Sequence, residues 1–279
     1  MNIFRLLLWP FRRRGPAPAV TNAAPAQLSL EQYQQLDPVI VLHEGENEVV
    51  YATPNLYTKF RVDTLHTKEP DTIAWISGFD AGDVFVDIGA NMGIYTIWAA
   101  KTRGMRVYAF EPESQNYALL CKNIVLNGLS EQVVGFCLAI GDENSYSRLY
   151  LSEFHAGGSC HTFGEMLDHR LEHRASKLAQ GCVSSSLDYL VATGAIPMPN
   201  HIKVDVDGLE HKVMEGARAV LKDRRVKSVL VEINSNLELH RNIIRDMEGL
   251  GFGYSESQVA IARRTEGAFA GVGNYVFSR

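Results

Sequence analysis

Residues 84–93 read VFVDIGANMG, an apolar run that leads into a short loop containing two glycines. Such a run is typical of a buried strand in a parallel sheet. A helical pattern follows at 94–101, where Ile94, Ile97 and Trp98 recur at the spacing of one helix face. The stretch therefore predicts a strand, a glycine turn and a helix, the unit from which α/β folds are built.

The same alternation continues along most of the chain. Strands are expected at 106–110, 133–140, 201–206 and 226–233, with a short accessory strand at 147–151. Helices are expected at 69–79, 113–127, 186–193, 209–222 and 237–250, and a charged helix at 166–180. The remaining segments predict a small hairpin or edge strands at 47–55 and 59–66, and an antiparallel pair of strands at 253–264 and 273–279. This order predicts an α/β fold with a parallel central sheet.

Composition limits the chemistry. The chain has 279 residues, a net charge of −5 and a pI near 6.0. Nucleic acid is therefore not the expected partner, because proteins that bind it carry a basic footprint. The cysteines form no CxxC pair, which disfavours structural zinc and disulfides and favours a reducing, cytoplasmic location. They are Cys121, Cys137, Cys160 and Cys182.

The N-terminus combines apolar residues with three consecutive arginines, Arg12–Arg14. Its apolar part is too short to span a bilayer, which needs about 20 residues, and its charge follows the apolar run, unlike a signal peptide. Two interpretations remain for residues 1–14: a frayed terminus, which we favour, or a weak contact with a membrane surface. Residues 15–27 are typical of a flexible Pro/Ala linker.

The glycine loop does not match the common phosphate-binding motifs. A dinucleotide fingerprint starting at Gly89 would need glycine at positions 91 and 94, where the chain has Asn91 and Ile94. No GxxxxGK[ST] motif is present either. Asn91 tolerates left-handed backbone better than most residues, so it is a credible substitute for glycine.

Acidic residues accompany this loop. Asp87 precedes the glycines, where it would repel a pyrophosphate but suit a cationic ligand such as S-adenosylmethionine. Glu111 ends the next expected strand, where a carboxylate can accept hydrogen bonds from ribose hydroxyls. The alternative is that Asp87 is a structural carboxylate and the glycines form only a turn.

Four stretches in order, VFVDIGANMGIYT, AFEP, IKVDVDGLEHKVMEGA and VLVEIN, resemble the FkbM family of S-adenosylmethionine-dependent methyltransferases over about residues 69–277. The resemblance implies a Rossmann-like class I methyltransferase fold, with a mostly parallel seven-stranded sheet, helices on both faces and an antiparallel last strand. It divides the chain into a flexible segment and linker at 1–27, a lead-in of short strands and a helix at 28–80, and a methyltransferase domain at 81–279. The cofactor residues that it implies are Asp87, Gly89, Ala90, Asn91, Gly93, Glu111, Pro112, Ala139 and Asp142, the last two in a stretch that borders the adenine. One departure is Asp207, where the family commonly has Glu.

The second motif supplies candidates for chemistry. Lys203, Asp205 and Asp207 alternate with apolar residues, so they share one face of a strand whose carboxyl end reaches the rim used by ligands in open α/β sheets. We expect Asp205 to orient the acceptor or act as base, with Lys203 tuning it. His211 is a second candidate base, or a solvated surface histidine. Glu232 completes the rim, or forms a structural ion pair with Lys203.

A metal ion is possible but not expected. Asp205, Glu232 and Asn234 resemble, in placement, the oxygen ligands of catechol-type methyltransferases, which would suit Mg²⁺ or Ca²⁺. Zinc at His155, Cys160 and His161 lacks a convincing fourth ligand, so we interpret that segment as a mobile loop on the acceptor side.

The predicted function is methyl transfer from S-adenosylmethionine to a hydroxyl of a sugar, glycan or small metabolite. The resemblance implies the acceptor class, and the residues alone do not. Two alternatives stay open here: a nicotinamide-dependent oxidoreductase, which Asn91 and Ile94 disfavour, and a non-catalytic module that binds the adenosyl cofactor. The residues indicate neither the oligomeric state nor the choice between oxygen and nitrogen as acceptor.

Overall fold

The computed structural model describes residues 28–279, which belong to two units divided between Asp37 and Pro38. The described part of the first unit holds helix α1 (Leu30–Gln34), which Ser29 caps. The expectations for residues 1–14 and 15–27 lie outside the described residues. The boundaries at 27/28 and 80/81 stay predictions.

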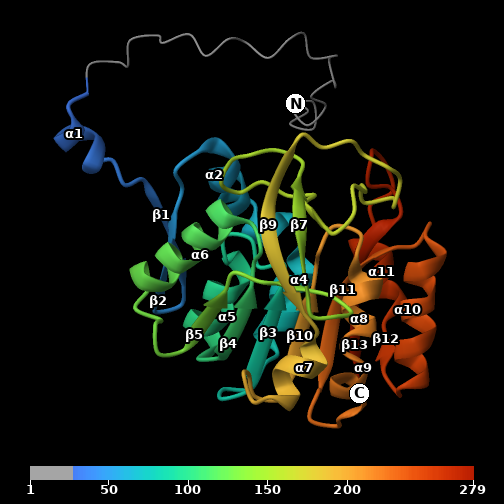
Figure 1. The fold of residues 1–279 in the computed structure, drawn as a ribbon. Helices are drawn as coiled ribbons and strands as arrows, with labels where there is room; N and C mark the ends of the chain where they lie inside the picture. The colour runs from blue at the N-terminus through green and yellow to red at the C-terminus, as the bar shows by residue number, and fades with distance from the viewer. Residues whose placement is uncertain (1–27) are drawn as a thin grey trace. The chain divides into compact units, whose positions relative to one another are not determined.

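A seven-stranded sheet forms the centre of the second unit, in the order β12-β13-β11-β10-β3-β4-β5 (Figure 1). Strands β5, β4, β3, β10 and β11 are parallel, and β13 runs antiparallel to both β11 and β12. This arrangement confirms the predicted fold class. The strands are β3 (Val84–Ile88), β4 (Arg106–Phe110), β5 (Val133–Phe136), β10 (His201–Val204), β11 (Ser228–Asn234), β12 (Gly253–Tyr254) and β13 (Val272–Ser278).

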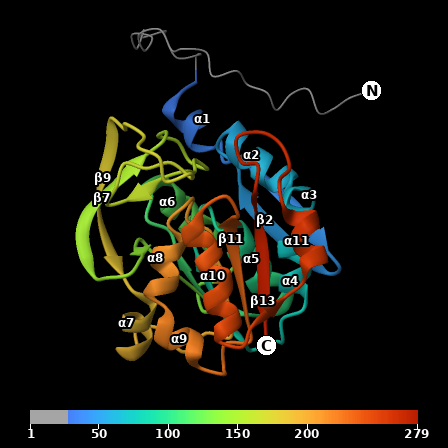
Figure 2. The ribbon, with the colours of Figure 1, turned by 90° about the vertical axis from the view of Figure 1, so that its right-hand side faces the viewer.

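Side chains alternate across the sheet and build a core on each face. On β3, Phe85 packs into one core whereas Val86 and Ile88 pack into the other. Figure 2 shows α8 and α10 on one side of β13 and α4 on the other. The first face is covered by α4 (Pro70–Ser77), α5 (Ile94–Arg103), α6 (Ser114–Leu126) and the hairpin of β1 (Val39–Glu44) and β2 (Asn47–Ala52). The second is covered by α7 (Leu187–Ala192), α8 (Glu210–Glu215), α9 (Arg218–Lys222) and α10 (Glu238–Gly249).

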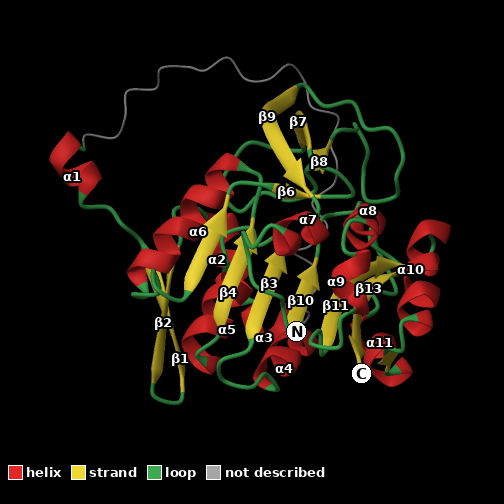
Figure 3. Cartoon of the chain, turned by 60° about the horizontal axis from the view of Figure 1, so that its bottom comes forward, coloured by secondary structure: helices red, strands yellow, loops and turns green. Residues whose placement is uncertain are grey.

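A second, four-stranded sheet lies beyond the carboxyl ends of the central strands (Figure 3). Its order is β6-β9-β7-β8, and it comprises β6 (Ala139–Ile140), β7 (Ser145–Leu151), β8 (Thr162–Phe163) and β9 (Leu178–Ser185). The single strand expected at 133–140 is therefore wrong, since β5 ends at Phe136 and β6 joins the other sheet. The accessory strand expected at 147–151 is confirmed within β7.

The charged helix expected at 166–180 does not form. Asp168 accepts hydrogen bonds from the backbone amides of Arg170 and Glu172 through Oδ1, and Leu171 has a positive φ of 59°. A side chain that binds nearby amides in this way competes with a helix. The segment instead forms turns that lead into β9.

Three further expectations need correction. Residues 59–66 are helical, in α2 (Leu56–Asp63) and α3 (Leu65–Lys68), because Asn55 and Thr58 form a capping box. The helix expected at 209–222 is divided into α8 and α9. The Asp188 carboxylate accepts hydrogen bonds from the backbone amides of Ala219 and Val220, in the first turn of α9. The strand expected at 253–264 is wrong over most of its length, because Ser255 caps helix α11 (Glu256–Ala262) and only β12 pairs with β13. No helix within 28–279 has the length and hydropathy to span a membrane.

Candidate functional site

The glycine turn between β3 and α5 lies against the end of β10. Gly89 and Asn91 have positive φ values of 82° and 52°, which confirms the left-handed conformation expected at Asn91. A Cβ atom on Gly89 would lie 1.8 Å from the carbonyl oxygen of Asp205. The turn therefore approaches β10 so closely that only glycine fits there.

One hollow opens on the side of this turn that faces β4 and the second sheet. We call it the first hollow. Apolar side chains of Phe110, Leu138 and Ile140 line it beside the carboxylate of Glu111. Its other lining residues come from the glycine turn, the loop after β4, β6, the end of β10 and the segment 158–163, and include Gly89, Asn91, Pro112, Ala139, His161 and Asp205.

Glu111 is fixed by backbone amides on both of its oxygens. Oε2 accepts from the amide of Asn91 at 2.7 Å, and Oε1 accepts from the amide of Glu113 at 2.8 Å. Burial raises the pKa of Glu111 to about 7, although these amides oppose the shift. Each carboxylate oxygen keeps a further lone pair, so Glu111 can accept hydrogen bonds from two hydroxyl groups of a ligand in the first hollow.

The segment 157–161 is held over the first hollow by hydrogen bonds. The carbonyl oxygen of Gly158 accepts from the side-chain amides of Asn91 at 2.7 Å and Asn116 at 3.1 Å. The amide of Cys160 donates to Asp207 Oδ2 at 2.6 Å. Burial lowers the pKa of His161 to about 4, and its Nε2 lacks a hydrogen-bond partner among the described residues. These contacts connect distant parts of the chain, which is why the motifs did not reveal them.

A second hollow opens on the other side of the glycine turn, toward α2 and α3. It shares Gly89, Asn91 and Asp205 with the first hollow. Its charged and aromatic polar lining comes from α2, α3, the start of α4, α5 and β10, and comprises Arg61, Lys68, Glu69, Tyr95 and Lys203.

Lys203 is the buried cation of this region, with only 2% of its surface exposed. Its Nζ donates to Asp205 Oδ2 at 2.8 Å, and it pairs in register with Asp87 on β3. Burial disfavours the ammonium, but the charges of Asp205, Asp87 and Glu69 outweigh that penalty and raise the pKa of Lys203. Lys203 therefore remains charged, and it holds Asp205 at the point where the two hollows meet.

Asp87 lies beneath the glycine turn and lines neither hollow. Its Oδ2 accepts from the hydroxyl of Thr96 at 2.6 Å, whereas Oδ1 is buried without a hydrogen-bond partner among residues 28–279. Burial raises the pKa of Asp87, and the nearby charge of Lys203 opposes that rise. Direct contact of Asp87 with a cofactor stays a prediction.

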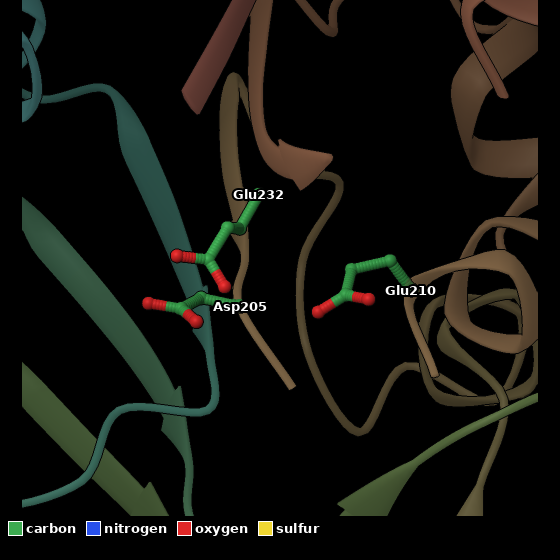
Figure 4. Close-up of side chains that lie close together, drawn as sticks. All are labelled: Asp205, Glu210 and Glu232. Carbon is green, nitrogen blue, oxygen red and sulfur yellow. The ribbon is translucent and has the colours of Figure 1, made fainter. Parts of the chain in front are cut away.

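Asp205 also belongs to a cluster of three carboxylates with Glu210 and Glu232, whose oxygens come within 4.8 Å of one another (Figure 4). Glu210 accepts from the amides of Val206 and Gly208, and burial raises its pKa to about 8. Glu232 accepts from Arg264 at 3.2 Å, and burial raises its pKa well above the usual range.

Protein donors already engage each carboxylate of this cluster. Glu210 accepts from backbone amides through both oxygens, Glu232 accepts from Arg264 through Oε1, and Asp205 accepts from Lys203 through Oδ2. The side-chain oxygen of Asn234, the third predicted ligand, accepts from the amide of Asn236 at 3.1 Å. We therefore derive no step through a metal.

Some predicted residues lie away from both hollows. His211 and Asp142 line a separate depression beside α8 and α10, and burial lowers the pKa of His211. Gly93 faces Leu120 of α6, which a Cβ atom would approach to 2.4 Å. The predicted residues that do meet at the two hollows are Gly89, Ala90, Asn91, Glu111, Pro112, Ala139, Lys203 and Asp205.

Comparisons with known proteins were made against this geometry. The model of the methyltransferase FkbM domain matches residues 87–254. Hexuronic acid methyltransferase AglP of Haloferax volcanii is 27% identical over 157 residues, which cover 56% of this chain and 58% of that protein. The chain thus spans little more than half the length of this relative.

Two solved structures resemble the chain more distantly. A methyltransferase FkbM from Methylobacillus flagellatus is 12% identical with a TM-score of 0.45, over 72% of this chain and 44% of that one. A precorrin-6y C5,15-methyltransferase from Geobacter metallireducens is 13% identical with a TM-score of 0.43, over 76% and 89%.

Proposed function

This chain belongs to the FkbM methyltransferase family, and from that premise we propose that it transfers a methyl group from S-adenosylmethionine to an oxygen atom of a sugar or glycan. The observation that carries the proposal is the pair of hollows that meet at Asp205 on either side of one glycine turn. One hollow suits a nucleoside, and the other leaves room for an acceptor.

The residues of the first hollow fit the adenosyl part of the cofactor. Glu111 offers carboxylate oxygens to the ribose hydroxyls, and Leu138 and Ile140 offer apolar surface to a base. Pro112, Ala139 and Asn91 complete that lining. When bound, S-adenosylmethionine supplies a methyl group on a sulfonium that is already a good leaving group.

Asp205 is the proposed catalytic residue. It lines both hollows, so its carboxylate can accept a hydrogen bond from an acceptor hydroxyl and take the proton that this hydroxyl loses. Lys203 keeps that carboxylate oriented through the bond to Oδ2. Glu210 and Glu232 lie close to Asp205. His211 lines a separate depression beside α8 and α10, so its role as a base stays a prediction.

The acceptor class rests on the relative named for hexuronic acid, together with the family. A nicotinamide-dependent oxidoreductase gains no support from the family match, and a purely binding module gains none either. The cytoplasmic location, the absence of a nucleic-acid partner and any membrane contact through residues 1–14 stay predictions.

Isothermal titration calorimetry with S-adenosylhomocysteine and with NAD tests the cofactor assignment. We expect S-adenosylhomocysteine to bind with one-to-one stoichiometry and NAD not to bind. Transfer of tritiated methyl groups from S-adenosylmethionine to a panel of glycans then tests the activity. Tight binding of NAD without binding of S-adenosylhomocysteine would reject the proposal.

A further inference from the structure

The second hollow carries an excess of positive charge. Lys203 forms an ion pair with Asp205 at 2.8 Å, and Lys68 forms one with Glu69 at 3.0 Å. The Lys68 and Lys203 charges outweigh burial and lower the pKa of Glu69 to about 2, so Glu69 stays ionised. Both carboxylates of the hollow are thus paired with lysines, and the third cation, Arg61, has no carboxylate partner in the hollow.

Arg61 is positioned but not neutralised. Its Nε donates to the carbonyl oxygen of Gly157 at 2.9 Å, which fixes the guanidinium at the end of α2. None of the ion pairs within residues 28–279 includes Arg61, and its two terminal nitrogens donate to no described residue. A guanidinium cannot lose its proton in a protein, so this charge is permanent.

The remaining acidic neighbour is Asp207, on the far side of the turn. The charges of Arg61 and Lys68 lower the pKa of Asp207, while burial raises it overall. Asp207 is engaged with the amide and thiol of Cys160, so it does not occupy the terminal nitrogens of Arg61. These nitrogens are therefore available to a ligand in the second hollow.

A planar fork with two free nitrogens matches a carboxylate, which it can bind through two parallel hydrogen bonds. We propose that the second hollow binds an acidic sugar, with its carboxylate on Arg61 and one of its hydroxyl groups toward Asp205. The inference rests on the proposed function, because it names the acceptor of the same site. It makes Arg61 a residue that selects anionic over neutral acceptors.

A binding experiment on the protein loaded with S-adenosylhomocysteine tests this inference. The probes are matched pairs that differ only in one carboxylate: p-nitrophenyl β-D-glucuronide against the glucoside, and the galacturonide against the galactoside. We expect NMR titration to show about tenfold tighter binding of at least one acidic member, since a charge-assisted bidentate pair readily contributes that factor. Equal binding within both pairs, or no binding of either uronide, would overturn the inference.

Variants of Arg61 test whether this residue causes the preference for acidic over neutral glycosides. Arg61→Gln should bind both members of a pair equally, and Arg61→Lys should recover part of the preference, because the charge returns without the fork. Arg106→Gln, at the exposed opposite end of β4, is the control and should keep the full preference. A preference retained in Arg61→Gln, or lost in Arg106→Gln, would contradict the assignment.

S-adenosylhomocysteine binding separates the two proposals. Arg61→Gln should bind it as the wild type does, because Arg61 does not line the first hollow. Failure of the wild type to bind it would reject the proposed function. Normal binding without discrimination between the glycosides would reject only the acidic acceptor.

Discussion

Lys203 donates from Nζ to Asp205 Oδ2 at 2.8 Å, two residues further along the same chain segment, while it is itself almost completely buried. The ammonium lies among the carboxylates of Asp205, Asp87 and Glu69, all of which raise its pKa. The Lys203–Asp205 ion pair connects the interior of the sheet with the edge where the two hollows meet. It therefore affects both stability and catalysis.

Replacing Lys203 by methionine should destabilise the fold. The change leaves Asp205, Asp87 and Glu69 without their shared cation, and breaking a buried ion pair costs about 3–5 kcal/mol. Urea unfolding followed by circular dichroism measures the free energy. The control is Lys59→Met, whose exposed pair with Asp63 should contribute little. A Lys203→Met protein as stable as that control would show that the buried pair is not structural.

Gly89→Ala should cost far more stability than Gly82→Ala. Both glycines have φ above 80°, so in both variants an alanine in the left-handed conformation lowers the free energy of unfolding by about 1 kcal/mol. Only at Gly89 does the new methyl group meet backbone, at 1.8 Å from the Asp205 carbonyl oxygen, whereas Gly82 faces open space. The difference between the two free energies of unfolding therefore reports the clash. Equal losses would mean that the turn can move away from β10.

Binding of S-adenosylhomocysteine should release protons near pH 7. Burial raises the pKa of Glu111 to about 7 in the free protein. Hydroxyl groups that donate to the carboxylate favour its ionised form, so the ligand lowers this pKa and affinity rises with pH from about 6 to 8. Calorimetry in two buffers with different heats of ionisation measures the proton release directly.

The variant Glu111→Gln tests whether Glu111 is the group that releases the proton. It removes the titrating group, so proton release near neutral pH should disappear and affinity should fall, by about tenfold or more. The exposed Glu131→Gln is the matched control and should behave as the wild type. Affinity that falls as pH rises would contradict the role of Glu111.

The same pKa has a consequence for the free protein. A carboxyl whose pKa is raised on folding, here from 4.5 to about 7, is bound to a proton in the folded state across a window where the unfolded chain has lost it. Its contribution to stability therefore declines as pH rises through that window and is constant above it. Glu111→Gln should flatten this part of the stability profile, as measured by urea unfolding at several pH values.

The central sheet could be predicted from sequence because its signals are local. The apolar runs at β3 and β4, and the glycine turn between β3 and α5, are each specified by adjacent residues. The second sheet could not be predicted in this way. Its strands β7 and β9 pair across residues 152–177, and the charged pattern inside that segment imitates a helix that the turn at Asp168 prevents.

The site could be predicted in part for the same reason. Glu111 and Asp205 lie at the carboxyl ends of predicted strands, where ligands bind in open α/β sheets, so the sequence indicates both residues. Arg61 lies on a helix that the sequence analysis interpreted as a strand, and its contact with Gly157 joins residues 96 positions apart. Asp87 shows the opposite case. Its place in the motif predicts contact with the cofactor, but the structure buries its side chain beneath the glycine turn.

Transfer of tritiated methyl groups by the wild type and by Asp205→Asn tests the central claim most directly. Both proteins should bind S-adenosylhomocysteine, because the substitution keeps the shape of the side chain and leaves Glu111 untouched. The wild type should label an acidic glycan, and Asp205→Asn should label it about 100-fold more slowly, the range that a lost general base accounts for. Equal rates in the two proteins, or no labelling of any glycan by the wild type, would contradict the account.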